Sequence, residues 1–205
     1  MTRITPGHLI YLTALSYYRE VNSIRDVVRI VAIANLAYFC VEFFFAVRIG
    51  SVSLFADSID FLEDASVNIL IFVAMGWSLL ARKRLSKFFS LLLLVPAISV
   101  LISTIYEINN PSAPDATSLT AVGTGALIVN FSCAFLLAKF RSSQKSLVLA
   151  AYLSARNDAV ANVAIISAGI ATMFWSSAIP DLAVGLAIGM LNADAAIKVW
   201  RSTEH

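Results

Sequence analysis

The sequence has few of the residues that usually bind transition metals or form covalent cross-links. Its 205 residues include only two histidines and two cysteines. His8 and His205 stand near the ends of the chain, outside every apolar run, and Cys40 and Cys133 lie in separate apolar runs with no Cys-x-x-Cys pattern. No disulfide framework is indicated, and both cysteines are expected to be small core residues.

Charged residues are also scarce. They make up 14% of the chain, hydrophobic residues make up 59%, and the mean hydropathy is +0.81. Because about a quarter of the residues of a soluble domain are charged, this composition indicates an integral membrane protein. No nucleotide-binding loop or nucleophile motif occurs. We therefore expect neither an enzyme nor a nucleic-acid-binding protein, and no bound cofactor.

Six apolar runs approach or exceed the roughly 20 residues that a membrane-spanning helix needs. The sequence therefore predicts an all-α membrane protein with six transmembrane helices in one domain, residues 27–201. Residues 1–26 form an N-terminal segment with a candidate interfacial helix at 8–21, and 202–205 a short tail. The six runs are about 27–47, 53–80, 88–106, 119–138, 147–174 and 182–200, the third with a kink expected at Pro96.

Basic residues set the orientation of the spans. The N-terminal segment, the second and fourth connections and the C-terminal tail are rich in Lys and Arg, whereas the opposite side has only Arg48. The positive-inside rule then places both termini in the cytoplasm. We expect an integral protein of the bacterial inner membrane.

Acidic residues interrupt the second run at helical spacing. Asp57, Asp60, Asp64 and Asn68 share one helix face, with Glu63 beside it. Charged groups at bilayer depth are costly, and they usually mark an ion or proton path.

A second polar stripe in the fifth run consists of Ser154, Asp158 and Asn162. The two stripes reach mid-membrane from opposite sides, and Asp64-Ala-Ser-Val-Asn68 resembles Asp158-Ala-Val-Ala-Asn162, as in an inverted repeat. The alternative interpretation is that these acids pair with Arg156 or bond to neighbouring helices.

Metal–proton exchange follows from the carboxylates without any histidine. Asp60, Asp64 and Asp158, with Ser154 one turn from Asp158, can form a four-ligand oxygen site. Buried neighbouring carboxylates favour holding protons while the site is empty, and a divalent cation expels them. Asp57 is expected to serve helix packing or an outer gate, and Glu42 to line the outward path or lie near the interface.

These motifs resemble the transmembrane domain of the cation diffusion facilitators over about residues 29–201. The resemblance implies export of a divalent metal in exchange for protons by a homodimer, with a tetrahedral transport site at Asp60, Asp64, Ser154 and Asp158. It depends on five features: Gly50-Ser-Val-Ser-Leu-Phe-Ala-Asp57, Asp60-x-x-x-Asp64, Asn130, Ser154-x-x-x-Asp158 and Ile179-Pro-Asp181-Leu-Ala-Val-Gly.

Two departures from the family pattern affect the expected substrate. The family usually has His or Asp at the position of Ser154, and it usually carries a cytoplasmic metal-binding domain after the sixth span, which this sequence lacks. Oxygen ligands favour hard ions such as manganese, although zinc accepts carboxylates. The substrate is thus zinc, manganese, iron or cobalt. The alternatives are a non-transporting or regulatory subunit that pairs with a complete transporter, and a proton-coupled carrier of an organic cation.

Overall fold

The computed structural model describes residues 6–74, 78, 80–81, 84, 101–140 and 146–203. Within these residues all regular secondary structure is helical, which confirms the predicted all-α class. The third predicted span, 88–106 with Pro96, lies outside the described residues except for 101–106, which belong to a helical segment at 101–109. The other helices are α1 (Pro6–Ile49), α2 (Val52–Ala74), α4 (Ala116–Ala138), α5 (Ser146–Phe174) and α6 (Ile179–Thr203).

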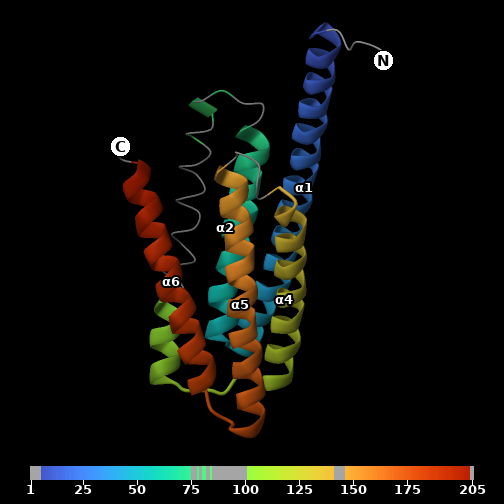
Figure 1. Ribbon diagram of the computed structural model, residues 1–205. Coiled ribbons are helices and arrows are strands. Elements are labelled where there is room, and N and C mark those ends of the chain that lie inside the picture. Colours follow the sequence, from blue (N-terminus) through green and yellow to red (C-terminus); the bar gives the residue numbers. More distant parts are fainter. Residues whose placement is uncertain are drawn as a thin grey trace.

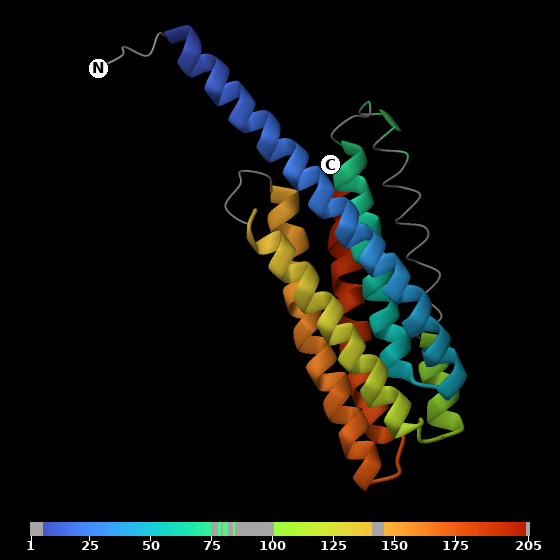
Figure 2. The same cartoon turned by 90° about the vertical axis from the view of Figure 1, so that its right-hand side faces the viewer.

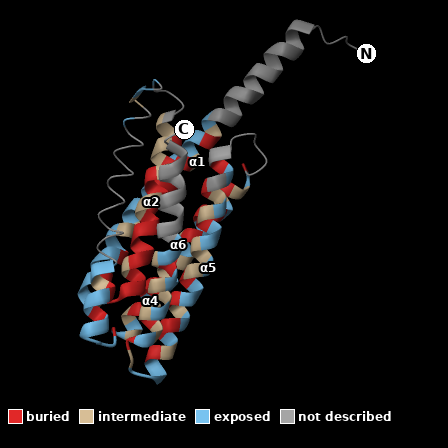
Figure 3. Cartoon of the chain, turned by 90° about the vertical axis from the view of Figure 1, so that its left-hand side faces the viewer, coloured by how far each residue is buried: buried red, intermediate tan, exposed pale blue. Residues whose placement is uncertain are grey.

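Four of the helices form a closed ring. Helix α1 packs on α2, α2 on α5, α5 on α4, and α4 on α1, while α6 packs outside the ring against α2 and α5 (Figure 1). The end of α6 lies at the same end of the bundle as the N-terminal half of α1 (Figure 1). Helix α2 contacts every other labelled helix and is buried along much of its length (Figure 3).

Three helical stretches of the described residues are long and apolar enough to cross a membrane: 22–49, 116–138 and 151–174. Large apolar side chains on them face away from the bundle, with 65% of Phe131, 74% of Phe135 and 69% of Val160 exposed. Such a surface is costly in water and favourable in lipid. The chain is therefore an integral membrane protein. Helix α2 is not among these three stretches because it carries four carboxylates.

Helix α1 is longer than the first predicted span. Its 44 residues extend about 66 Å at 1.5 Å per residue, roughly twice the thickness of a bilayer hydrocarbon core. The helix predicted at 8–21 is present, but it continues without a break into the span and projects beyond the other helices (Figure 2).

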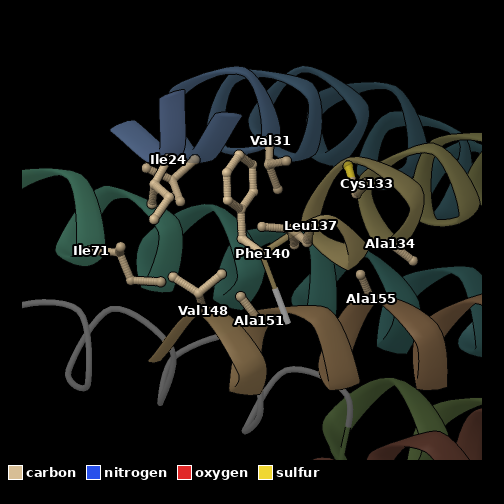
Figure 4. Packing of buried hydrophobic residues seen from close by; sticks show 11 residues of the cluster. Ile24, Val31, Ile71, Cys133, Ala134, Leu137, Phe140, Val148, Ala151 and Ala155 are labelled. Atoms are coloured by element: carbon tan, nitrogen blue, oxygen red, sulfur yellow. The ribbon is translucent and has the colours of Figure 1, made fainter. Parts of the chain in front are cut away.

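The core of the ring has two apolar clusters separated by a polar layer. One cluster lies at the end from which α1 projects and includes Ile24, Val31, Leu137 and Val148 (Figure 4). The other lies near the α1–α2 turn and includes Ala46, Leu54, Leu119 and Ile165. Most of the buried carboxylates and amides of the four helices fall between the two clusters: Asn35, Glu42, Asp60, Asp64, Asn68, Asn130 and Asn162. Asp57 lies at the edge of this polar layer, between Ala56 and Ile59 of the second cluster.

One prediction about the core is wrong. Cys133 is buried in the first cluster, but Cys40 is exposed on the outer face of α1. Cys40 lies five residues after Asn35 and two before Glu42, both buried, so it lies on the opposite face of α1. Apolar residues on both faces of a membrane helix hide this difference in the sequence.

The turn between α1 and α2 sets where α2 begins. Gly50 ends α1 with a φ of 68°, a conformation that favours glycine, and the Ser51 amide donates to the Ala46 carbonyl at 3.0 Å. The Ser51 hydroxyl then accepts from the Leu54 amide at 3.2 Å, as the N-cap of α2.

Asp181 of α6 holds this turn in place through hydrogen bonds. Its buried carboxylate accepts from the Val52 amide at 2.7 Å, the Ser51 hydroxyl at 2.7 Å and the Ser53 hydroxyl at 2.5 Å. A Cβ added at Gly185 would lie 2.8 Å from the backbone of Val52 and Ser53, so α6 approaches α2 as closely as two helices can. Asp181 and Gly185 thus join α6 to the start of α2.

We predict that Asp181→Ala destabilises the protein by about 1–3 kcal/mol, because it leaves buried donors of the α2 N-terminus without an acceptor. Thermal unfolding in detergent measures the change. Asp115→Ala is the matched control: Asp115 caps α4 by accepting from the Ser118 amide at 2.8 Å, but it is exposed. Hydrogen bonds from Ser118 lower the pKa of Asp115. Equal losses in the two variants would contradict the anchoring role of Asp181.

Candidate cation-binding site

A pocket of about 270 Å³ lies between α2, α5 and α6. Its polar wall consists of Asp60 and Glu63 from α2 and of Ser154, Asn157 and Asp158 from α5. Apolar side chains complete it: Ala161, Ile188 and Leu191. Three of the four residues predicted to bind the ion therefore line one pocket, and all of its polar groups carry at least one oxygen.

Asp64, the fourth predicted residue, lies directly behind the pocket wall. It is 3% exposed, and its Oδ1 accepts a hydrogen bond of 2.8 Å from the Ser154 hydroxyl. Residues 60 and 64 are one turn apart on α2, so the two carboxylates lie on the same helix face. The structure thus brings the two predicted stripes together through a direct α2–α5 contact.

The four predicted residues are neighbours without forming a closed coordination shell. Among the described residues, no three His, Cys, Asp or Glu side chains converge on a point where they could hold one metal ion. Ser154 uses its proton to bond Asp64, while Asp60 and Asp158 face the pocket. A bound ion would need these side chains to turn inward by changes of rotamer.

A chain of buried hydrogen bonds crosses the ring beside the pocket. Asn130 of α4 donates to the Asn162 side chain at 3.0 Å, and Asn162 in turn donates to Asp57 Oδ2. Asp57 and Asn162 are both 0% exposed. Asparagines within the apolar runs are expected to bond between helices; Asn130 and Asn162 do so, and Asp57 packs the α2–α5 interface.

Asn68 departs from this expectation, and of the two positions predicted for Glu42 the one near the membrane interface is wrong. Asn68 bonds within its own helix, because its side-chain amide donates to the Asp64 carbonyl at 2.8 Å. Glu42 does not lie at the interface: it is 0% exposed in the centre of the bundle. Sequence position alone cannot separate these cases, because each residue lies on a helix face shared with other polar groups.

Arg156 does not neutralise the acidic residues. It is exposed, and its guanidinium donates to the Asn157 side chain at 3.3 Å. The one salt bridge seen in the part of the chain that the structure describes joins Arg29 to Asp26 within α1. The proposed pairing of the acids with Arg156 is therefore not what holds them, whereas bonding to neighbouring helices holds Asp57 and Asp64.

Glu63 and Asn157 were not among the predicted ligands, yet both line the pocket. A signal for them exists in the sequence, since each lies one residue before a predicted ligand, Asp64 or Asp158. Each also follows another predicted ligand, Asp60 or Ser154, by three residues, a spacing that places two side chains on the same face of a helix.

A family model described as the cation efflux transmembrane domain matches residues 28–203, which covers most of the chain and all of the pocket. The match confirms the resemblance inferred from the sequence motifs. No curated protein matches the chain.

We predict that Asn162→Ala destabilises the protein by about 1–3 kcal/mol, because Asp57 and Asn130 both lose a buried partner. Thermal unfolding in detergent is the measurement. Ser167→Ala, on an exposed position of the same helix with a bond only to the Val163 carbonyl, is the control and should change little. A loss no larger in the Asn162 variant would show that the hydrogen-bond chain does not stabilise the ring.

Proposed function

The chain belongs to the cation efflux family of membrane transporters, and from this premise we propose that it exports a divalent metal ion in exchange for protons. The observation that supports the proposal is the acidic pocket between α2, α5 and α6. It combines carboxylates from two helices at mid-membrane, where a charged group needs a functional partner.

The proposed ligands of the transported ion are Asp60, Asp64, Ser154 and Asp158. Asp60, Ser154 and Asp158 already face the pocket, and Asp64 is one hydrogen bond away from it through Ser154. An entering cation competes for the Asp64 carboxylate and draws the oxygens inward. Because every donor is an oxygen, the site favours hard ions such as manganese over zinc, with iron and cobalt between them.

Charge balance supports the exchange of metal for protons. No Lys, Arg or His is among the buried residues that the structure describes, while Asp60 and Asp64 are buried. Several buried carboxylates without a counter-charge are costly, so they have to hold either protons or a metal ion. Binding one kind of ion then displaces the other, which is the requirement for antiport.

Alternating access is consistent with the layout of the core. The apolar clusters close the ring above and below the polar layer. Asp158 follows the start of α5 by 12 residues, or about 18 Å, close to the middle of the helix. For an ion at this depth to reach each side of the membrane in turn, the helices have to shift relative to one another. We propose six spans with both termini in the cytoplasm, in a homodimer of the bacterial inner membrane.

We predict that the protein reconstituted in liposomes moves protons when manganese, zinc, cobalt, cadmium or iron(II) is added, and that Asp64→Ala abolishes this movement. A pH-sensitive dye inside the liposomes reports it. Asp115→Asn, an exposed acid away from the pocket, is the control and should transport normally. If no metal causes proton movement with the unaltered protein, the result would favour a subunit that pairs with a complete transporter. Competition by an organic amine but by no metal would favour a carrier of an organic cation.

We predict that Ser154→His shifts the preference of the transporter toward zinc. The change replaces a neutral hydroxyl at the pocket wall by imidazole, a nitrogen ligand that zinc prefers over oxygen. The ratio of zinc to manganese transport, measured in the same liposomes, should rise several-fold. Ser167→His, on the exposed side of α5, is the matched control. An unchanged ratio would remove Ser154 from the set of ligands.

A further inference from the structure

A second pair of acidic residues lies in the polar layer, apart from the pocket. Glu42 of α1 and Asp57 of α2 are both 0% exposed, and neither lines the pocket. The pocket opens between α2, α5 and α6, whereas this pair lies inside the ring, where Asp57 meets Asn162 of α5. The antiport described above assigns it no role.

The two carboxyl groups lie within hydrogen-bonding reach of each other. Their oxygens are nevertheless without donors: Glu42 Oε1, Glu42 Oε2 and Asp57 Oδ1 have no hydrogen-bond partner, and only Asp57 Oδ2 is satisfied, by Asn162. An ionised carboxylate can only accept. Two ionised carboxylates in contact would therefore have no proton with which to form a hydrogen bond, and they would repel each other in a buried site.

The groups around the pair supply no positive charge. Tyr38 of α1 lies near both acids, but its hydroxyl donates to the Val122 carbonyl at 2.6 Å. Asp60 of α2 adds further negative charge. Asp64 of α2 and Asp158 of α5 also add negative charge near Asp57, while Asn162 of α5 and Asn130 of α4 are neutral and bonded to each other. No Lys, Arg or His is among the residues whose side chains the structure describes as buried.

We propose that Glu42 and Asp57 form a proton-binding site, in which the Glu42 carboxyl group carries one proton and donates it to Asp57. The proton joins two of the three orphaned oxygens in one hydrogen bond and leaves one negative charge, which Asn162 stabilises from the other side. A proton needs no cavity, so it suits a position closed by four packed helices better than a metal ion with a coordination shell does.

The site also has a consequence for exchange, and this step depends on the proposed function. A divalent ion bound at Asp60 brings two positive charges next to the pair, which favours loss of the shared proton to water on the side to which the pocket opens. Return of the proton after the metal leaves restores the hydrogen bond. The pair thus adds one proton per cycle to those displaced from the pocket itself.

The proton itself is tested by infrared spectroscopy of the purified protein at neutral pH, where a protonated carboxyl group has its own carbonyl band. We expect a band that is lost in Glu42→Gln, whose amide preserves the hydrogen bond to Asp57 and hence the fold. Asp115→Asn, the exposed control, should leave it in place. If neither Glu42→Gln nor Asp57→Asn changes the band, the pair is not protonated and the proposal is wrong.

The coupling is tested by calorimetric titration of manganese into the purified protein in two buffers that differ in ionisation enthalpy. We expect Glu42→Gln to bind the metal while releasing about one proton fewer than the unaltered protein. An unchanged number of released protons would overturn the coupling. Absence of manganese binding to the unaltered protein would count against the proposed function instead, and the infrared result would still decide whether the pair holds a proton.

Discussion

The absence of buried positive charge is the constraint on which the structure depends. The ring buries Glu42, Asp57 and Asp64 in its polar layer, and no buried Lys, Arg or His faces them in the part of the chain that the structure describes. Leaving such groups ionised and unpaired in a low-dielectric interior is prohibitively costly. Neutral donors therefore supply part of the stabilisation, through Ser154 to Asp64 and Asn162 to Asp57. The rest of the stabilisation has to come from protons or metal ions that bind the carboxylates. The lack of buried positive charge therefore destabilises the empty bundle and also makes it a place where protons and metal ions exchange.

The position of α2 determines how the buried carboxylates are arranged into a binding site. Helix α2 holds four of the acids, so its rotation and depth decide which carboxylate meets which partner. Its start is fixed by Gly50, which ends α1, and by Asp181, which accepts four hydrogen bonds from residues 51–53. With that end fastened to α6, residues one turn apart divide between two surroundings. Asp60 faces the pocket between α2, α5 and α6, and Asp57 faces the closed interior of the ring.

The sequence predicted much of this because helical periodicity depends only on local spacing. Helices α4, α5 and α6 begin within four residues of the starts predicted for the fourth, fifth and sixth spans, and the acidic stripe of α2 meets Ser154 and Asp158 of α5, as predicted. The sequence did not predict which residues form hydrogen bonds between distant parts of the chain. Nothing near Asp181 indicates that it bonds residues 128–130 positions earlier. Likewise Asn68 and Asn162 occupy matching places in two similar five-residue segments, yet one bonds its own helix and the other bridges α4, α5 and α2.

The acids that line the pocket and the Glu42–Asp57 pair differ more in their accessibility than in their chemistry. Both consist of carboxylates and amides in one polar layer, so composition alone would assign them the same ligand. The pocket, however, lies outside the four-helix ring and has a volume of about 270 Å³, enough for an ion that keeps part of its hydration shell. Glu42 and Asp57 are enclosed on all sides by packed helices, with three oxygens that reach neither water nor a donor. A metal ion could enter there only by breaking the ring, whereas a proton moves along hydrogen bonds. Packing around chemically similar residues can thus assign a metal ion to one site and a proton to the other.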